Sequence, residues 1–105
     1  MKSIELITAE RQRQIEVEGR TAEHDRQHKN GELALVAACY AIPGDRRSWV
    51  SGVISKGRAD LIVKLFPWAL TWFKPTPDDR IRELTKAGAL IAAEIDRLLA
   101  ECEQS

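Results

Sequence analysis

The chain of 105 residues is 44% hydrophobic and 30% charged, which indicates one soluble domain, residues 1–105, with a single modest core. Its 16 basic and 16 acidic residues give a formal net charge of zero, which argues against a general nucleic-acid binder and favours self-association, with a homodimer as the expected form. No apolar run is long enough for a secretory signal or a membrane span, so we expect a cytosolic protein with no membrane partner, whose two cysteines, Cys39 and Cys102, are reduced.

The first predicted helix covers residues 8–18. Thr8 can cap its start, and Gly19 can end it. Its clearly apolar residues are Ile15 and Val17, so we expect the helix to lie mostly at the surface or to pack on a partner.

A second helical region begins after Thr21, an N-cap candidate, and extends to Ile42. It runs either as one helix or as two helices separated at Asn30-Gly31, because a glycine inside a helix costs about 1 kcal/mol relative to alanine. Residues 43–45, Pro-Gly-Asp, stop it. Its alanines permit close helix approach and lie at positions 34, 37, 38 and 41.

The connection over residues 43–75 is predicted to be irregular and contains all three tryptophans. Residues 50–54 are β-branched enough for a short strand, although no partner strand is visible, and residues 58–65 favour a short helix. We expect the connection to fold its aromatic side chains over the helices, and a connection of this length in a small domain is often functional.

The last helix is predicted from Thr76 as the cap and Pro77 at the first helical position, and it should run to about Glu101. A stripe of apolar residues at helical spacing is expected to face the core: Ile81, Leu84, Gly88, Ile91, Ile95 and Leu98. The expected fold is therefore all-α, a small bundle of three to four helices with a long aromatic-rich connection between the second and last helices.

The two histidines of the chain lie together, in a segment rich in carboxylates. If this segment is helical, then His24, His28 and Glu32 follow one another at a spacing of four residues along one face, with Asp25 nearby. Imidazole and carboxylate groups on adjacent turns can bind a divalent metal, and His28 could act as a base. The alternative is a set of solvated polar residues held by ion pairs with neighbouring cations.

Two further groups are candidates for a site. Glu94 borders the apolar stripe of the last helix, where a carboxylate is costly unless it binds a metal or pairs with an arginine from a neighbouring helix. Trp68 and Trp72 could stack a base or form a binding patch, and Arg46 and Arg47 could contact phosphate. The alternative for the aromatic residues is an extension of the core.

Several segments resemble a small family of uncharacterised phage and prophage helical proteins. They are Glu-His-Asp at 23–25 with His28 and Gly-Glu-Leu at 31–33, Phe-Pro-Trp at 66–68, and the last-helix segment 86–98. This family is distantly similar to MazG-type all-α nucleotide pyrophosphohydrolases, in which helix-borne glutamates and an aspartate hold magnesium against a nucleoside triphosphate. The resemblance implies a metal site of Glu32 and Glu94, with Asp25 and His28 as local substitutes. The chain departs from the MazG pattern because Glu32 has no glutamate three residues away.

Two functions from different classes follow. The first is hydrolysis of a nucleotide assisted by Mg²⁺ or Mn²⁺, in which His28 and Glu32 are catalytic, Asp25, His28, Glu32 and Glu94 hold the metal, and Arg46, Arg47, Trp68 and Trp72 bind the substrate. The second is a phage accessory protein that binds and inhibits a host defence protein without chemistry. A module that binds a nucleotide without turnover is the intermediate case.

Overall fold

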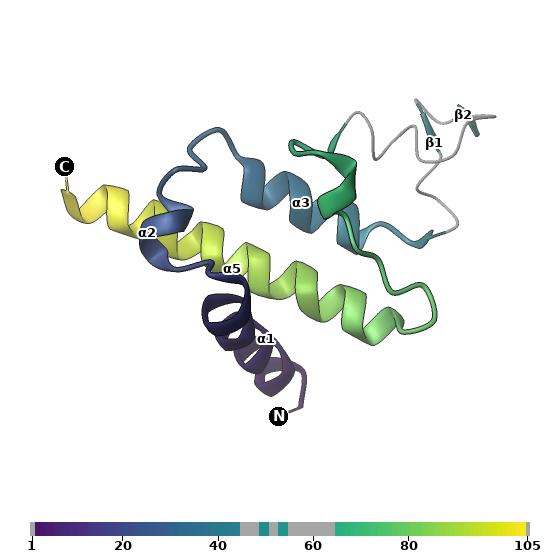
Figure 1. Ribbon diagram of the computed structural model, residues 1–105, viewed down its shortest axis with the longest axis horizontal. Coiled ribbons are helices and arrows are strands. Elements are labelled where there is room, and N and C mark those ends of the chain that lie inside the picture. Colours follow the sequence, from purple (N-terminus) through teal and green to yellow (C-terminus); the bar gives the residue numbers. More distant parts are fainter. Residues whose placement is uncertain (1, 45–48, 51–52, 55–64, 105) are drawn as a thin grey trace.

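The computed structural model describes residues 2–44, 49–50, 53–54 and 65–104. The helices are α1 (Lys2–Glu18), α2 (Ala22–Asp25), α3 (Glu32–Ala41) and α5 (Arg80–Gln104), and a short 3-10 helix, η2, covers Leu70–Trp72. The expected all-α bundle, with a long aromatic-rich connection before the last helix, is confirmed (Figure 1). Within the described ranges, every helix is too short or too polar to cross a lipid bilayer.

Helix α5 is the element on which the others pack (Figure 1). Helix α3 runs beside it, and the core between them contains Leu33, Val36 and Cys39 of α3 against Ala87 and Leu90 of α5. Phe66, from the connection, closes this core, and Trp68 and Phe73 pack against it. The expectation that the connection folds aromatic side chains over the helices agrees with this packing.

The apolar stripe of α5 does not face the core, which corrects the sequence prediction. Its large side chains are about half exposed or more, from Leu98 at 46% to Ile81 at 67%. The buried face of α5 instead carries Ala87, Leu90 and Ala93, and it accommodates the buried polar residues Glu83 and Arg97. Periodicity identifies a face but not its partner, and the small residues opposite the stripe allow α3 to approach closely.

Helix α1 begins at Lys2, six positions before the predicted start at Thr8, and ends as predicted before Gly19, whose φ of 69° is a left-handed conformation that favours glycine. It packs on α5, where a Cβ added to Gly88 would lie 2.7 Å from Cδ1 of Ile7. Its buried residues are polar, Glu10 and Gln14. The prediction that this helix lies mostly at the surface agrees with its exposure, but the polar character of its contact with α5 was not predicted.

The histidine segment is not one helix. Thr21 caps α2 by accepting a hydrogen bond from the backbone N–H of His24 at 3.2 Å, as predicted, but α2 ends at Asp25. Gly31, at φ 79°, precedes α3. Of the two arrangements that the sequence allowed, the structure has the broken one, and His24, His28 and Glu32 do not share a continuous helical face.

Helix α5 starts at Arg80 rather than at Pro77, and it extends past Glu101 to Gln104. Asp79, not Thr76, caps it, because its carboxylate accepts a hydrogen bond from the backbone N–H of Arg82 at 3.0 Å. Thr76 belongs to the turn before the helix, where its backbone N–H donates to Glu83 at 3.0 Å.

The connection contains a hairpin instead of an unpaired strand. Strand β1 (Trp49–Val50) pairs antiparallel with β2 (Val53–Ile54), so the two halves of the predicted strand are partners. Arg46, Arg47 and most of the predicted helix over residues 58–65 lie outside the described residues. The connection is anchored near its end, where the Tyr40 hydroxyl accepts a hydrogen bond from the backbone N–H of Lys74 at 3.0 Å.

Candidate ligand-binding pocket

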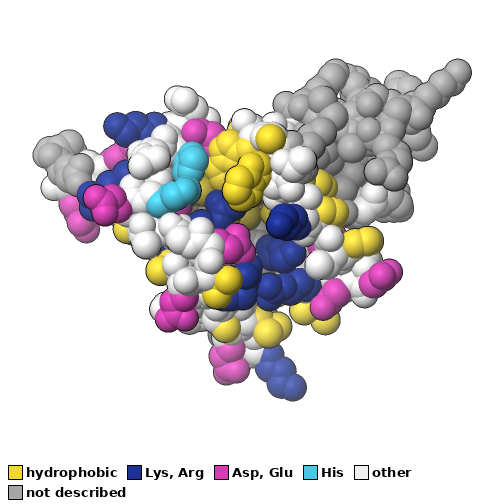
Figure 2. Space-filling model, in the orientation of Figure 1, with side chains coloured by type: hydrophobic (Ala, Val, Ile, Leu, Met, Phe, Trp, Pro, Cys, Tyr) yellow, Lys and Arg dark blue, Asp and Glu magenta, His cyan; other side chains and the backbone are white. Residues whose placement is uncertain are grey.

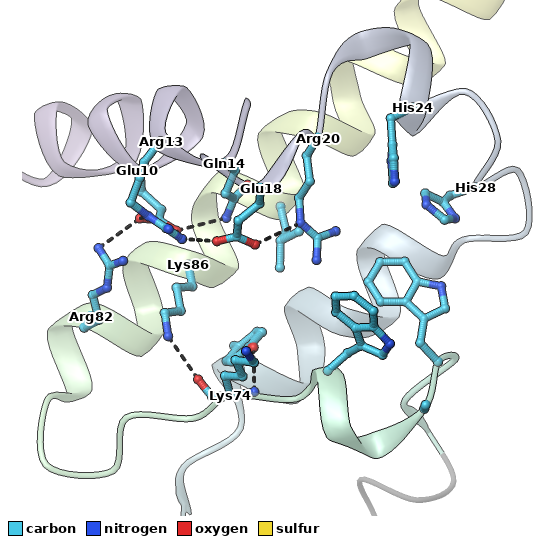
Figure 3. Close-up of a pocket in the computed structure, with 15 residues that line it drawn as sticks. Glu10, Arg13, Gln14, Glu18, Arg20, His24, His28, Lys74, Arg82 and Lys86 are labelled. Carbon is cyan, nitrogen blue, oxygen red and sulfur yellow. Dashed lines mark hydrogen bonds and ion pairs between the residues drawn. The ribbon is translucent and has the colours of Figure 1, made fainter. Parts of the chain in front are cut away.

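A pocket of about 800 Å³ lies between α1, α5 and the aromatic connection (Figure 3). Its cationic side chains come from four separate segments, and two carboxylates and two imidazoles lie among them. Lys and Arg side chains gather beside a hydrophobic group and the two histidines (Figure 2). The pocket is lined by Glu10, Arg13, Gln14, Glu18, Arg20, His24, His28, Tyr40, Trp68, Ala69, Trp72, Lys74, Arg82, Lys86 and Leu90.

One wall of the pocket is a chain of alternating charges centred on Glu10, which is 2% exposed. Arg13 donates two hydrogen bonds of 2.8 Å to its carboxylate, and Arg82 of α5 lies 2.9 Å away. Burial raises the pKa of Glu10, but the hydrogen bond and charge of Arg13 and the charge of Arg82 outweigh it and hold the pKa below its ordinary value. Glu10 is therefore ionised, and it joins α1 to α5.

The chain of charges continues along α1 toward the aromatic side. Arg13 also pairs with Glu18, and Arg20 donates to Glu18 at 3.3 Å (Figure 3). The hydrogen bond from Arg13 to Glu10 raises the pKa of this guanidinium, and the contact with Glu18 raises it further. Arg20 also lies over the ring of Trp68, 5.1 Å from its centroid, so it links the charged wall to the aromatic wall.

Lys86, another cation of the pocket lining, has a different environment. Its ammonium donates to the backbone carbonyl of Lys74 at 3.0 Å and lies 5.5 Å from the ring centroid of Tyr40. Burial lowers the pKa of Lys86, and the nearby positive charges of Arg82 and Arg13 lower it further. The charges of Glu10 and Glu18 oppose this lowering in part, and an anion placed beside the amine would oppose it further.

The opposite wall is aromatic. The ring of His28 lies 4.9 Å from that of Trp68 and 5.0 Å from that of His24, and Trp72 is 63% exposed at the rim. Among the described residues, three atoms of pocket-lining side chains are buried without a hydrogen-bond partner: Gln14 Oε1, His24 Nδ1 and His28 Nε2. Buried polar atoms of this kind are usually satisfied by water or a ligand.

The four proposed metal ligands do not all meet, because Asp25 and Glu94 each pair with an arginine. Asp25 is 1% exposed and pairs with Arg11 at 3.0 Å, which ties α2 to α1. Glu94 pairs with Arg97 at 2.6 Å on its own helix, and not with an arginine from a neighbouring one. Within the described part of the chain, no group of three His, Cys, Asp or Glu residues is arranged to hold a metal ion.

Glu32 and His28 are the two proposed catalytic residues that do meet. Glu32 Oε2 lies 3.4 Å from Nδ1 of His28, and its other oxygen accepts the backbone N–H of Asn30 at 2.5 Å. Partial burial raises the pKa of Glu32, but these hydrogen bonds outweigh it and lower the pKa overall. The carboxylate thus orients the imidazole of His28, which lines the pocket, while Glu32 itself does not line it.

The pocket contains four of the residues predicted to act in a site, His24, His28, Trp68 and Trp72. Sequence reasoning missed its cationic residues. Arg82, Lys86 and Leu90 recur every four residues, so a basic edge beside the core face of the last helix was a usable signal. No such signal marks α1, whose charges alternate in sign.

Comparison with known proteins found no matching family, no similar curated protein and no similar solved structure. The interpretation of this pocket therefore depends on its own chemistry.

Proposed function

We propose that this protein binds a nucleotide, a ligand with both a phosphate group and an aromatic base, in the pocket between α1, α5 and the connection. The observation that carries the proposal is the joint presence of a cationic cluster and two indole rings in one pocket of about 800 Å³. This volume falls within the range of roughly 300–1,000 Å³ that is typical of small-molecule sites.

The charge of the pocket favours an anionic ligand. Five cationic side chains line it, Arg13, Arg20, Lys74, Arg82 and Lys86, against two carboxylates, Glu10 and Glu18, which leaves an excess of three positive charges. Lys86 is the clearest phosphate contact, because its ammonium bonds to a backbone carbonyl and the neighbouring charges that lower its pKa are cations. The carboxylates of Glu10 and Glu18 offset these cations in part, and a phosphate would add further negative charge beside Lys86.

The aromatic wall favours a planar base. Trp72 is exposed at the rim, and a base stacked on an indole ring gains roughly 1–3 kcal/mol. The unpartnered Nε2 of His28 and Oε1 of Gln14 would then meet polar edges of the ligand. These contacts require no metal ion and no bond cleavage, so binding without turnover is the function that the pocket supports best.

The proposal is tested by quenching of tryptophan fluorescence, because two of the three tryptophans line the pocket. ATP, GTP, CTP, AMP, adenosine and inorganic triphosphate are titrated with and without Mg²⁺. We expect nucleotides to bind at least about tenfold more tightly than adenosine or inorganic triphosphate, since only nucleotides engage both walls. Equal affinity for inorganic triphosphate and ATP would contradict a role of the aromatic wall.

A matched pair of variants locates the site. Lys86→Met removes a cation from the pocket, and Lys2→Met removes an exposed cation outside it. Lys86→Met should weaken nucleotide binding by about tenfold, the effect of losing one charged hydrogen bond, and Lys2→Met should not change it. Unchanged binding in Lys86→Met, with the helical circular dichroism preserved, would place the nucleotide elsewhere.

Hydrolysis is a second candidate function, favoured by the contact between His28 and Glu32. An imidazole oriented by a carboxylate can act as a general base toward water. Release of pyrophosphate or phosphate in the presence of Mg²⁺ or Mn²⁺ tests it. His28→Gln should abolish the release and retain much of the fluorescence quenching. Quenching without any release in the wild-type protein would show that the protein binds the nucleotide and does not hydrolyse it.

A further inference from the structure

Gln14 of α1 is a buried polar residue of the pocket with an incomplete set of hydrogen bonds. It is 3% exposed and lines the pocket beside Glu10 (Figure 3). Its Nε2 donates a hydrogen bond of 3.2 Å to Oε2 of Glu10. Within the described ranges, its Oε1 is buried and has no hydrogen-bond partner. One half of this amide is therefore satisfied, and the other half is not.

Glu10 determines the orientation of the Gln14 amide. An ionised carboxylate only accepts hydrogen bonds, and the lowered pKa of Glu10 keeps this carboxylate ionised. Because Nε2 is the only donor of a glutamine side chain, Nε2 must face Glu10 and Oε1 must point away from it. The terminal torsion of a glutamine is soft, so a small rotation presents Oε1 to the pocket while Nε2 keeps its bond. The pocket thus has an oriented acceptor that requires a donor.

Gln14 lies between the cationic end and the aromatic end of the pocket. Its side chain bonds to Glu10, which pairs with Arg82 at 2.9 Å. Its backbone carbonyl accepts a hydrogen bond of 3.0 Å from the N–H of Arg20, whose guanidinium lies over the ring of Trp68. A nucleotide has the same order, because its sugar separates the phosphates from the base. With the phosphates at Arg82 and the base at the indole rings, the sugar is the part that passes Gln14.

The hydrogen-bonding chemistry of a nucleotide leads to the same assignment. Its phosphates are ionised near neutral pH and accept hydrogen bonds without donating them, so they would repel Oε1. The base is assigned to the aromatic wall, which begins where Arg20 covers Trp68. The 2′ and 3′ hydroxyls of ribose are the remaining donors. An acceptor that burial has already removed from bulk water gains more from such a donor than an exposed one does.

We propose that Oε1 of Gln14 accepts a hydrogen bond from a ribose hydroxyl, so that the pocket recognises the sugar as well as the phosphates and the base. The inference rests on the proposed nucleotide site and adds to it the identity of the sugar. An analogue without the hydroxyls leaves a buried acceptor unsatisfied, and a site built to hydrogen-bond a hydroxyl rejects a ligand that lacks it. Gln14 therefore determines specificity and supplies no charge.

Dideoxynucleotides test the inference in the wild-type protein. ATP and GTP are each titrated beside their 2′,3′-dideoxy forms, with quenching of tryptophan fluorescence as the readout. The dideoxy forms should bind about tenfold more weakly, the effect of one lost hydrogen bond to a buried acceptor. The 2′-deoxy and 3′-deoxy forms then show which hydroxyl donates. Equal affinities of the parent and dideoxy nucleotides would overturn the inference and leave the nucleotide site in place, whereas no binding of either would overturn the proposed function as well.

Two glutamine variants of α1 assign the effect to one residue. Gln14→Met keeps the length of the side chain and removes the acceptor. Gln12→Met makes the same change at an exposed position outside the pocket lining, where the amide also bonds to a carboxylate one turn away, that of Glu16 at 2.8 Å.

The readout is the ratio of the ATP affinity to the dideoxy-ATP affinity. It should fall from about tenfold to about one in Gln14→Met and stay at about tenfold in Gln12→Met. A loss of packing alone would weaken both nucleotides equally and leave the ratio unchanged. A ratio that remains at about tenfold in Gln14→Met would therefore overturn the assignment to Gln14.

Discussion

The two long contacts of α5 are made by different chemistry. Against α3 the contact is apolar and close-packed, with Leu33 and Val36 meeting Ala87 and Leu90. Against α1 it depends on Glu10, held by arginines from both helices, and on the seating of Ile7 over Gly88. An apolar contact stabilises in proportion to the area that it buries, whereas an ionic contact stabilises only while every charge keeps a partner. The contact with α3 forms the core of the fold, whereas the contact with α1 borders the charged pocket.

The largest effect that would separate the two contacts is expected on the apolar side. Leu33→Ala removes a side chain with 0% exposure and should lower the free energy of unfolding by about 3 kcal/mol, through lost burial and the cavity left behind. Urea denaturation measures the change. Val17→Ala, at an exposed position of α1, should change stability by less than about 0.5 kcal/mol. A loss below about 1 kcal/mol in Leu33→Ala would mean that the apolar contact does not dominate.

The ionic side is expected to show a smaller and pH-dependent effect. Glu10→Gln should lower the free energy of unfolding by about 2 kcal/mol at pH 7, because Arg13 and Arg82 lose their shared carboxylate but are partly exposed and can be solvated.

Acidification should have a related effect on the wild-type protein. The pKa of Glu10 is lowered in the folded state, so its contribution is fully present above its ordinary value of 4.5 and is lost as the pH falls through the folded pKa. Denaturation curves from pH 6 downward, to about pH 3, should therefore converge for the wild-type protein and Glu10→Gln. Parallel curves would contradict this assignment.

The proposed binding of a nucleotide provides a third test, on the ionic side of α5. A bound phosphate favours charged Lys86, so the affinity should be full below the pKa of the free amine and should decline as the pH rises through that lowered value. Fluorescence titrations between about pH 8 and 10 should show the decline. Lys86→Arg, which stays protonated, should flatten it with less than about a threefold loss of affinity at pH 8. The same decline in both proteins would assign the titration to another group.

The smallest effect is expected at Gly31, in the loop between α2 and α3. Gly31→Ala should cost about 1 kcal/mol, because φ of 79° is unfavourable for a residue with a Cβ, although a Cβ would have free space there. Gly31→Asn, which tolerates this conformation better, should cost less. Thermal unfolding of both variants measures the difference, and equal losses would point to a cause other than the backbone angle.

The α3 side of the apolar contact was predictable from sequence, whereas its α5 side and the ionic contact were not, for physical reasons. Helix stops at Gly19 and after Ile42, and the alanines of α3, follow from local rules that hold wherever these residues occur. The exposure of the α5 stripe could not be predicted, because a heptad pattern is the same whether its partner is a core or another helix. The partners of Glu10 could not be predicted either, since ionic pairing between α1 and α5 depends on the angle at which the helices meet.

The alternating row of guanidinium and carboxylate groups along α1 has a consequence for selectivity. A ligand anion can engage Arg13 or Arg82 only in competition with Glu10 and Glu18, which already occupy part of their donor capacity. A singly charged molecule gains little when it competes with these carboxylates. A di- or triphosphate has enough oxygen atoms to share the guanidinium donors with Glu10 and Glu18. We therefore expect the affinity to rise steeply with the negative charge of the ligand, so that Glu10 and Glu18 select against singly charged anions.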